Sequence, residues 1–210
     1  MIYDMAAYTP RLASLESMAV PLVLALCLAG GCGAAATTGG ATAGAAMGAW
    51  PPHPRLRLGE AGVQRIKAAT VADPTARALL LNISAHVDEL LAEPLPSGGM
   101  NGSHGATGLL CDTIRDHLYS YGLLFRLSTN ATKRAHLAAR AAKEMVAVAQ
   151  LTNWNPKRFL TVAETMHSLA IGYDWFYESL TPAQRTTIED GIFQNGVAVG
   201  MGCYADNCTW

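Results

Sequence analysis

Apolar side chains recur at three- and four-residue steps from about residue 60 to about residue 195. This spacing gathers them on one face of an α-helix, whereas a half-buried strand would need strict alternation of apolar and polar residues. No sustained alternation is present in the sequence, and no Asn-Gly hairpin turn joins two β-branched runs. The sequence therefore predicts an all-α protein.

Turn and capping residues divide this region into successive helices. Asp73-Pro74 is a helix-start signal, and Thr181-Pro182-x-Gln184 combines capping-box spacing with a favoured first-turn proline. The segment from residue 196 to residue 210 is Gly-rich and carries neither a cap nor a stop signal, so no helix is predicted there. The expected helices cover residues 60–70, 74–93, 109–127, 131–150, 159–179 and 182–195.

The turn at residues 128–130 joins two amphipathic stretches with almost no loop. Two helices connected so tightly pack as antiparallel neighbours, and these two are expected to form an αα-hairpin. Successive hairpins build either a partial (α/α) toroid, the architecture we favour, or an open α-solenoid. The hydrophobic pattern alone does not separate these two arrangements.

The first fifty residues differ from the rest in being rich in Ala, Gly and Thr. Residues 18–29 form an apolar run too short to span a bilayer comfortably, and Ala34-Ala35-Ala36 matches a cleavage site. We interpret residues 1–36 as a secretory signal peptide, with a signal anchor and a lipoprotein-type signal at Cys32 as alternatives. Residues 37–52 are then a linker and residues 53–210 a folded domain. The protein is expected to be secreted or periplasmic, without stable membrane association once the signal is removed.

Glycosylation sequons agree with export. Those at Asn101 and Asn130 fall in predicted loops, where a glycan disturbs no packing, whereas the sequon at Asn82 lies inside a predicted helix. Cys203 and Cys208 are spaced for a local disulfide, which would leave Cys111 unpaired. No cysteine or histidine spacing resembles a zinc site, and we expect neither a metal nor a cofactor.

The formal net charge of −1 and the low share of charged residues, 15%, exclude several kinds of partner. A nucleic-acid-binding surface and a polybasic membrane patch both need clustered Lys and Arg, which the sequence lacks. An anionic partner is still compatible with the sequence, but local Lys and Arg side chains would have to bind it.

The stretch from Asn153 to Tyr177 contains the candidate binding residues. Aromatic rings next to amide and charged side chains suit carbohydrate, because a sugar ring has an apolar C–H face and a rim of hydroxyls. The alternative is that these rings fill the core between helices. The backbone N–H groups at the start of the helix would also favour an anion. The candidate substrate-binding residues are Trp154, Asn155, Arg158, Tyr173, Asp174 and Trp175.

Other polar residues in and near this stretch are expected to be structural. Thr161-x-x-Glu164 has capping-box spacing, so Glu164 is interpreted as a capping partner rather than a catalytic acid. His167 is expected in the core or at its boundary, and the Arg115-Asp116 pair in a helix-surface or inter-helix contact. Asp174 has a second interpretation, as an acceptor of hydrogen bonds from a neighbouring helix end.

An ordered set of motifs resembles the N-terminal toroid of the heparinase II/III-like and alginate lyase group of polysaccharide lyases. The set covers roughly residues 53 to 195 in that group's order and close to its spacing. The motifs are His53-Pro54-Arg55-Leu56, Arg115-Asp116 with Tyr119 and Arg126, Asn153-Trp154-Asn155-Pro156, Phe159-Leu160 with Ala163-Glu164, Ile171-Gly172-Tyr173-Asp174-Trp175-Phe176-Tyr177, and Thr181-Pro182-Ala183-Gln184-Arg185.

The resemblance implies an exported enzyme that cleaves a uronic-acid-containing, anionic polysaccharide by β-elimination. That chemistry needs a group that neutralises the uronate carboxylate, a base for the C5 proton and an acid for the leaving oxygen. The residues with these roles in the group are expected beyond residue 210, so the sequence is interpreted as an N-terminal fragment without assigned catalytic residues. A non-catalytic helical binding module and a toroidal glycoside hydrolase are the alternatives.

Overall fold

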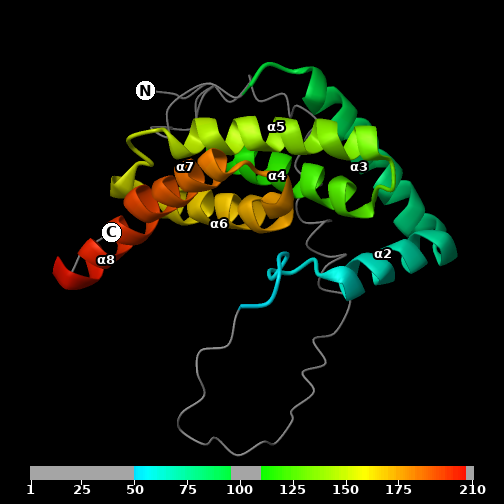
Figure 1. Cartoon of the computed structure of the whole chain (residues 1–210), viewed down its shortest axis with the longest axis horizontal. Helices are drawn as coiled ribbons and strands as arrows, with labels where there is room; N and C mark the ends of the chain where they lie inside the picture. Colours follow the sequence, from blue (N-terminus) through cyan, green and yellow to red (C-terminus); the bar gives the residue numbers. More distant parts are fainter. Residues whose placement is uncertain (1–49, 96–109, 207–210) are drawn as a thin grey trace, which may run out of the picture.

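The structure, a computed structural model, describes residues 50–95 and 110–206, and it is helical with no strand in those two ranges. This confirms the all-α prediction. Figure 1 shows α5 above α4 and α6, with α2 at one end of the bundle and α8 at the other. The helices are α2 (Glu60–Ala72), α3 (Pro74–Ala92), α4 (Leu110–Leu127), α5 (Ala131–Ala149), α6 (Phe159–Phe176), α7 (Pro182–Ile192) and α8 (Ala198–Asp206).

Polar side chains cap the start of three of these helices, and two of the caps, Asp73 and Thr181, were predicted from the sequence. Asp73 accepts a hydrogen bond from the backbone of Thr75, and Asn130 accepts one from the backbone of Lys133. Thr181 forms the complete capping box with Gln184 and precedes the first-turn proline. These side chains satisfy backbone N–H groups that have no partner inside a helix, and they fix where each helix begins.

The predicted capping box at Thr161 and Glu164 is wrong. A 3₁₀ turn at Pro156–Arg158 leads directly into α6, which starts at Phe159 and places Thr161 inside the helix. Thr161 is buried there, and its backbone carbonyl accepts a hydrogen bond from the hydroxyl of Thr165. Glu164 is therefore free to bond across to α4.

The C-terminal part of the described chain is more helical than predicted. The backbone leaves α7 through a π-helical segment, Phe193–Val197, and continues as α8. Gly196 lies in that segment, where a Cβ atom would come within 2.9 Å of the Met166 sulfur. No helix was predicted for this segment because glycine has a low helix propensity. The close packing of Gly196 against α6 favours the helical backbone of the π-helical segment.

Pairs of contacting residues define the helix directions. Arg115 meets Glu164, Tyr119 meets His167 and Phe125 meets Phe176, so α4 and α6 run parallel. The expected hairpin of α4 and α5 is antiparallel, since His117 meets Glu144 and Phe125 meets Arg134. Contacts from α3 to α5, Ser84 with Lys133 and Glu93 with Arg140, show that these two helices are parallel. Adjacent layers therefore have opposite directions.

Two glycines allow α4 and α6 to approach closely. A Cβ atom at Gly122 on α4 would lie 2.3 Å from the Trp175 ring, and one at Gly172 on α6 would lie 3.0 Å from Leu118 on α4 and 2.7 Å from the Met145 sulfur on α5. These two helices also form the most extensive helix-to-helix contact in the described chain. The central core is consequently built between α4, α5 and α6.

A buried ionic network ties α3, α4 and α5 together. The carboxylate of Glu144, 1% exposed, lies 2.8 Å from Nδ1 of His117 and accepts bonds from the Tyr121 hydroxyl and from Nε of Arg140. Arg140 also donates to the carbonyls of Glu93 and Pro94 at the end of α3. Burial, and then the Glu144 charge, raise the pKa of Tyr121 above its ordinary value.

Several predictions fall outside the described residues. These are the signal peptide at 1–36, most of the linker at 37–52, the glycosylation site at Asn101 and the disulfide partner Cys208. Asn130 is described, and it is an exposed N-cap residue. In the described part of the chain, no helix has both the length and the apolar character needed to cross a membrane.

Candidate functional site

Residues 53–58, here called the strap, are fixed to α6 by Asp174. The Asp174 carboxylate is 3% exposed and accepts backbone bonds from Arg55 at 2.9 Å and Leu56 at 2.7 Å. Its Oδ1 also lies 2.5 Å from Nδ1 of His53. The indole of Trp175 completes the attachment by donating to the Leu56 carbonyl at 2.9 Å. Asp174 thus accepts hydrogen bonds, in agreement with its second interpretation. The donors, however, lie in the strap and not at the end of a neighbouring helix.

The strap carries a strained turn directly after this attachment. The backbone N–H of Leu58 donates to the Leu56 carbonyl at 2.6 Å, which closes a three-residue turn around Arg57. Arg57 has a φ of 50°, in the left-handed region that residues with a Cβ atom rarely adopt. Because both flanking residues are held, Leu56 by hydrogen bonds and Leu58 by burial in the core, the strained conformation is enforced.

The middle of α6 carries an exposed histidine held by a buried tyrosine of α4. The hydroxyl of Tyr119, a residue 2% exposed, lies 2.7 Å from Nε2 of His167, and the two rings stack with centroids 5.9 Å apart. Trp175 also packs edge-on against Tyr119, with ring centroids 5.4 Å apart. His167 itself is exposed. Partial desolvation, and then the positive charges of Arg57 and Arg115, lower the pKa of His167.

A second polar group continues along the same two helices. Arg115 lies 2.6 Å from a carboxylate oxygen of Asp112 and 3.1 Å from one of Glu164. The thiol of Cys111 donates to Glu164 at 3.4 Å. Burial, and then the nearby Asp112, raise the pKa of Cys111 to about 11, so this residue is a protonated, unreactive thiol at neutral pH.

Cys111, Asp112 and Glu164 have the ligand types and the proximity of a metal site, since their ligand atoms lie within 4.8 Å of one another. Arg115 already pairs with both carboxylates, and its charge opposes a divalent cation at the same place. The group is accordingly explained as an ion-pair cluster between α4 and α6.

Half of the sequence-predicted binding residues lie in the interior. Trp154 is 1% exposed, and its indole donates to the Val148 carbonyl at 3.1 Å, which anchors the loop to α5. Trp175 is 2% exposed and Asp174 is 3% exposed, both beneath the strap. None of these three side chains offers a surface to a sugar. The core interpretation of the aromatic residues therefore holds for both tryptophans.

The other three predicted residues lie nearer the surface but do not form one site. Asn155 has a left-handed φ of 58°, and its backbone N–H donates to the Asn153 side chain at 2.7 Å, which leaves it unavailable to an anion. Arg158 is exposed at the start of α6. Tyr173 lies near the opposite end of α6, where its hydroxyl donates to Glu189.

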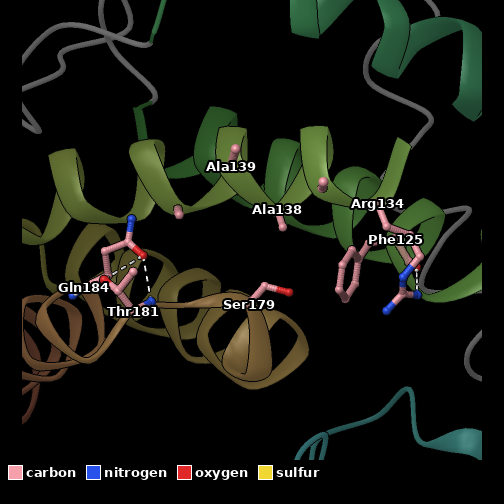
Figure 2. A pocket seen from close by; sticks show the side chains of 9 residues that line it. Phe125, Arg134, Ala138, Ala139, Ser179, Thr181 and Gln184 are labelled. Atoms are coloured by element: carbon pink, nitrogen blue, oxygen red, sulfur yellow. Dashed lines mark hydrogen bonds between the residues drawn. The ribbon is translucent and has the colours of Figure 1, made fainter. Parts of the chain in front are cut away.

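A surface groove of about 450 Å³ separates α5 from the start of α7. Small side chains of α5 line it, and Figure 2 shows one of them, Ala138, on the side of α5 that faces Ser179 and Thr181. At one end the guanidinium of Arg134 lies 4.1 Å from the centroid of the Phe125 ring. The groove has little polar chemistry and no acid–base pair, so it is a weaker candidate than the surface at His167.

Only some of the residues at the His167 surface could be predicted from the sequence. Tyr119 and Arg115 belonged to the family-like motifs, but Arg115 and His167 were expected to be structural, and Arg57 had no assigned role. What joins them is the parallel packing of α4 and α6 together with the attached strap. No family model and no curated protein matches this chain.

Proposed function

We propose that this chain is a helical, substrate-binding part of a secreted polysaccharide lyase that acts on uronic-acid-containing polysaccharide by β-elimination. The observation that carries the proposal is the exposed imidazole of His167, which the buried Tyr119 holds and whose pKa is lowered by partial burial and then by the charges of Arg57 and Arg115. A uronate has a carboxylate and hydroxyls on one ring, and a cation next to a neutral imidazole suits both.

The helix directions support the partial (α/α) toroid within this proposal. In such an array the helices of each layer run parallel to one another and antiparallel to the other layer. Here α4 and α6 run parallel, and α5 runs against them beside the parallel α3. An open α-solenoid would have the same local pairing, and it remains the alternative architecture.

We assign binding rather than bond cleavage to these residues. Tyr119 is too deeply buried for its hydroxyl to reach a sugar, so it positions His167 and does not itself transfer a proton to substrate. Arg115 is shared between two carboxylates, which reduces the charge it can offer to a ligand. No catalytic residue, cofactor or metal is part of the proposal.

Two other functions were weighed against this one. A glycoside hydrolase needs two carboxyl groups facing each other across a cleft. The candidates Glu164 and Asp174 lie on one helix, and both are engaged, with Arg115 and with the strap. A non-catalytic helical module that binds anionic glycans uses the same surface as the lyase, and only an activity assay distinguishes the two.

The test is a binding and cleavage screen with the full chain. Binding to alginate, pectate and heparan sulfate would be measured by calorimetry, with neutral dextran as the control polymer. Cleavage would be followed by the ultraviolet absorbance of the unsaturated uronate product. Binding of acidic polymers over dextran supports the proposal, and product formation identifies the lyase. Failure to bind any acidic polymer, or equal binding of dextran, would overturn it.

A further inference from the structure

We propose that the groove between α5 and the start of α7 is a subsite for one acidic residue of a polysaccharide, with Arg134 as the cation for its carboxylate. The inference rests on the proposed function and adds a second binding region for the same class of substrate. Bond cleavage needs an acid–base pair, but binding does not, so the absence of such a pair from the lining residues is compatible with a subsite.

The groove has the size and the lining of a ligand site. Its volume of about 450 Å³ lies within the range of about 300–1,000 Å³ that is typical of such sites. One wall is apolar and built from short side chains of α5, which leave room for a ring to approach the helix. These side chains are Ala135, Ala138, Ala139 and Ala142. A sugar ring can place its C–H face against this wall.

The opposite wall offers hydrogen-bonding groups that are not used by the protein. The hydroxyl of Ser179 is exposed and has no hydrogen-bond partner among the described residues. Gln184 accepts two hydrogen bonds from Thr181 through its side-chain oxygen, and its side-chain N–H groups have no partner in the described part of the chain. A free hydroxyl and a free amide suit the hydroxyl groups of a sugar.

Arg134 closes the groove at the end opposite Gln184, as Figure 2 shows. Its Nη1 donates to the Phe125 carbonyl at 2.6 Å, and the guanidinium lies 4.1 Å from the centroid of the Phe125 ring. These two contacts fix the orientation of the guanidinium. Its Nε and Nη2 atoms have no hydrogen-bond partner in residues 50–95 and 110–206, and neither is a buried atom, so both reach the surface.

The free nitrogens of Arg134 determine the class of ligand. Nε and Nη2 lie on the same edge of the guanidinium and form a fork that matches the two oxygens of a carboxylate. No acidic residue lines the groove, and no carboxylate in the described chain forms an ion pair with Arg134. A neutral sugar would leave this cation unpaired, whereas a uronate supplies the opposite charge.

The experiment uses the full chain and a galacturonate trisaccharide, with its methyl ester as the uncharged control and triglutamate as an acidic ligand without a sugar ring. Calorimetry gives the three affinities. We expect the ester and triglutamate each to bind at least about tenfold more weakly than the acid. Equal affinity for the ester would overturn the carboxylate subsite, and equal affinity for triglutamate would overturn its assignment to a sugar.

NMR identifies where the trisaccharide binds. Binding in the groove should shift the signals of the Ala138 methyl group and of the Gln184 side-chain amide. If the trisaccharide shifts only signals at the His167 surface, the groove is not a subsite and the proposed function stands.

Two variants separate charge from space in the groove. Arg134→Met removes the cation but keeps an apolar side chain over the Phe125 ring, so it should weaken binding of the acid by about tenfold and leave binding of the ester unchanged. Unchanged ester binding would also show that this variant is folded. Ala138→Leu fills the groove and should weaken binding of both ligands by about tenfold.

Each variant has a control outside the groove. Arg65→Ala removes an exposed arginine of α2, and Ala147→Leu enlarges an exposed alanine of α5 that does not line the groove. Both controls should bind the acid as the wild type does. If Arg134→Met also binds the acid as the wild type does, the subsite is wrong and the proposed function stands. If the wild type binds neither the trisaccharide nor any acidic polymer, both fall.

Discussion

Both carboxylate oxygens of Asp174 lie 2.9 Å from the backbone nitrogen of Arg55, which is 119 residues away in the sequence. One buried side chain of α6 thus fixes the strap, and the strap carries Arg57, whose charge contributes to lowering the pKa of His167. The surface at His167 that we propose for an acidic sugar depends on a carboxylate that does not itself face solvent.

Replacement of Asp174 by alanine is expected to release the strap. The change removes the acceptor for the backbone N–H groups of Arg55 and Leu56 and leaves them without partners. An unsatisfied buried donor costs about 1–3 kcal/mol, so we expect the free energy of unfolding to fall by about 3 kcal/mol. Urea unfolding measures this, and hydrogen exchange at the Arg55 and Leu56 amides reports the release.

Asp190→Ala is the matched control, because that carboxylate lies exposed on α7. It should change stability by less than about 0.5 kcal/mol. Unaltered protection of the Leu56 amide in Asp174→Ala would contradict the role assigned to this carboxylate.

Glycines at helix contacts should respond to alanine according to what a Cβ atom would meet. At Gly191 the nearest atoms are the Cα, Cβ and carbonyl oxygen of Ala149, each 2.7 Å away, so the α5 backbone itself must move. Overpacking of this kind costs about 1–3 kcal/mol, and Gly191→Ala should lower the free energy of unfolding by that amount.

Gly202 provides the opposite case. No heavy atom lies within 4 Å of a Cβ built there, and the residue is inside α8. Gly202→Ala should stabilise the protein by up to about 1 kcal/mol through helix propensity. The two variants would be compared by thermal and urea unfolding, and equal effects would show that α7 does not pack on α5 as described.

Much of the fold follows from local signals. Asp73, Asn130 and Thr181 each cap a helix because a short polar side chain precedes an apolar-periodic run. The capping box predicted at Thr161 was wrong because a capping box is recognised from four consecutive residues only. The start of α6 instead depends on the 3₁₀ turn before it and on the packing of Trp154 against α5. α8 was missed because its glycines have a poor helix propensity, whereas the backbone continues from α7 through the π-helical segment Phe193–Val197 directly into α8.

The candidate site was less predictable than the fold. An aromatic residue in a sequence is equally consistent with a core and with a sugar surface, and Trp154 and Trp175 proved to be core. To predict the contact of Tyr119 with His167, one must know the relative direction of α4 and α6, which are not consecutive in the sequence. The position of Arg57 depends on a turn with a positive φ, which could not be predicted because the residue in that turn is not a glycine.

Glu144 is expected to be the most sensitive residue of the buried ionic network. Glu144→Ala would leave the side chain of Arg140, which is 10% exposed, without its carboxylate partner. It would also remove the hydrogen-bond partner of Tyr121 and His117. Breaking a buried ion pair by removing one member costs about 3–5 kcal/mol, and we expect a loss in that range by urea unfolding. Glu89→Ala, on the exposed side of α3, is the control and should be nearly neutral.

His167 should make stability depend on pH in a defined direction. Its pKa is below the ordinary 6.5 in the folded protein, first through burial and then through Arg57 and Arg115. As the pH falls below about 6.5, the unfolded chain binds the proton more readily than the folded protein does. The contribution of His167 is therefore fully present above that pH and is lost as the pH falls towards the folded pKa.

His167→Gln should remove this part of the pH dependence, and Arg57→Ala should diminish it by raising the pKa of His167 towards its ordinary value. The free energy of unfolding of the three proteins would be measured in urea from about pH 5 to about pH 8. His86→Gln serves as the comparison, since that ring lies 3.0 Å from Asp116 on the other side of α4. A wild-type curve that coincides in slope with that of His167→Gln across this range would show that the ring is not held neutral by its surroundings.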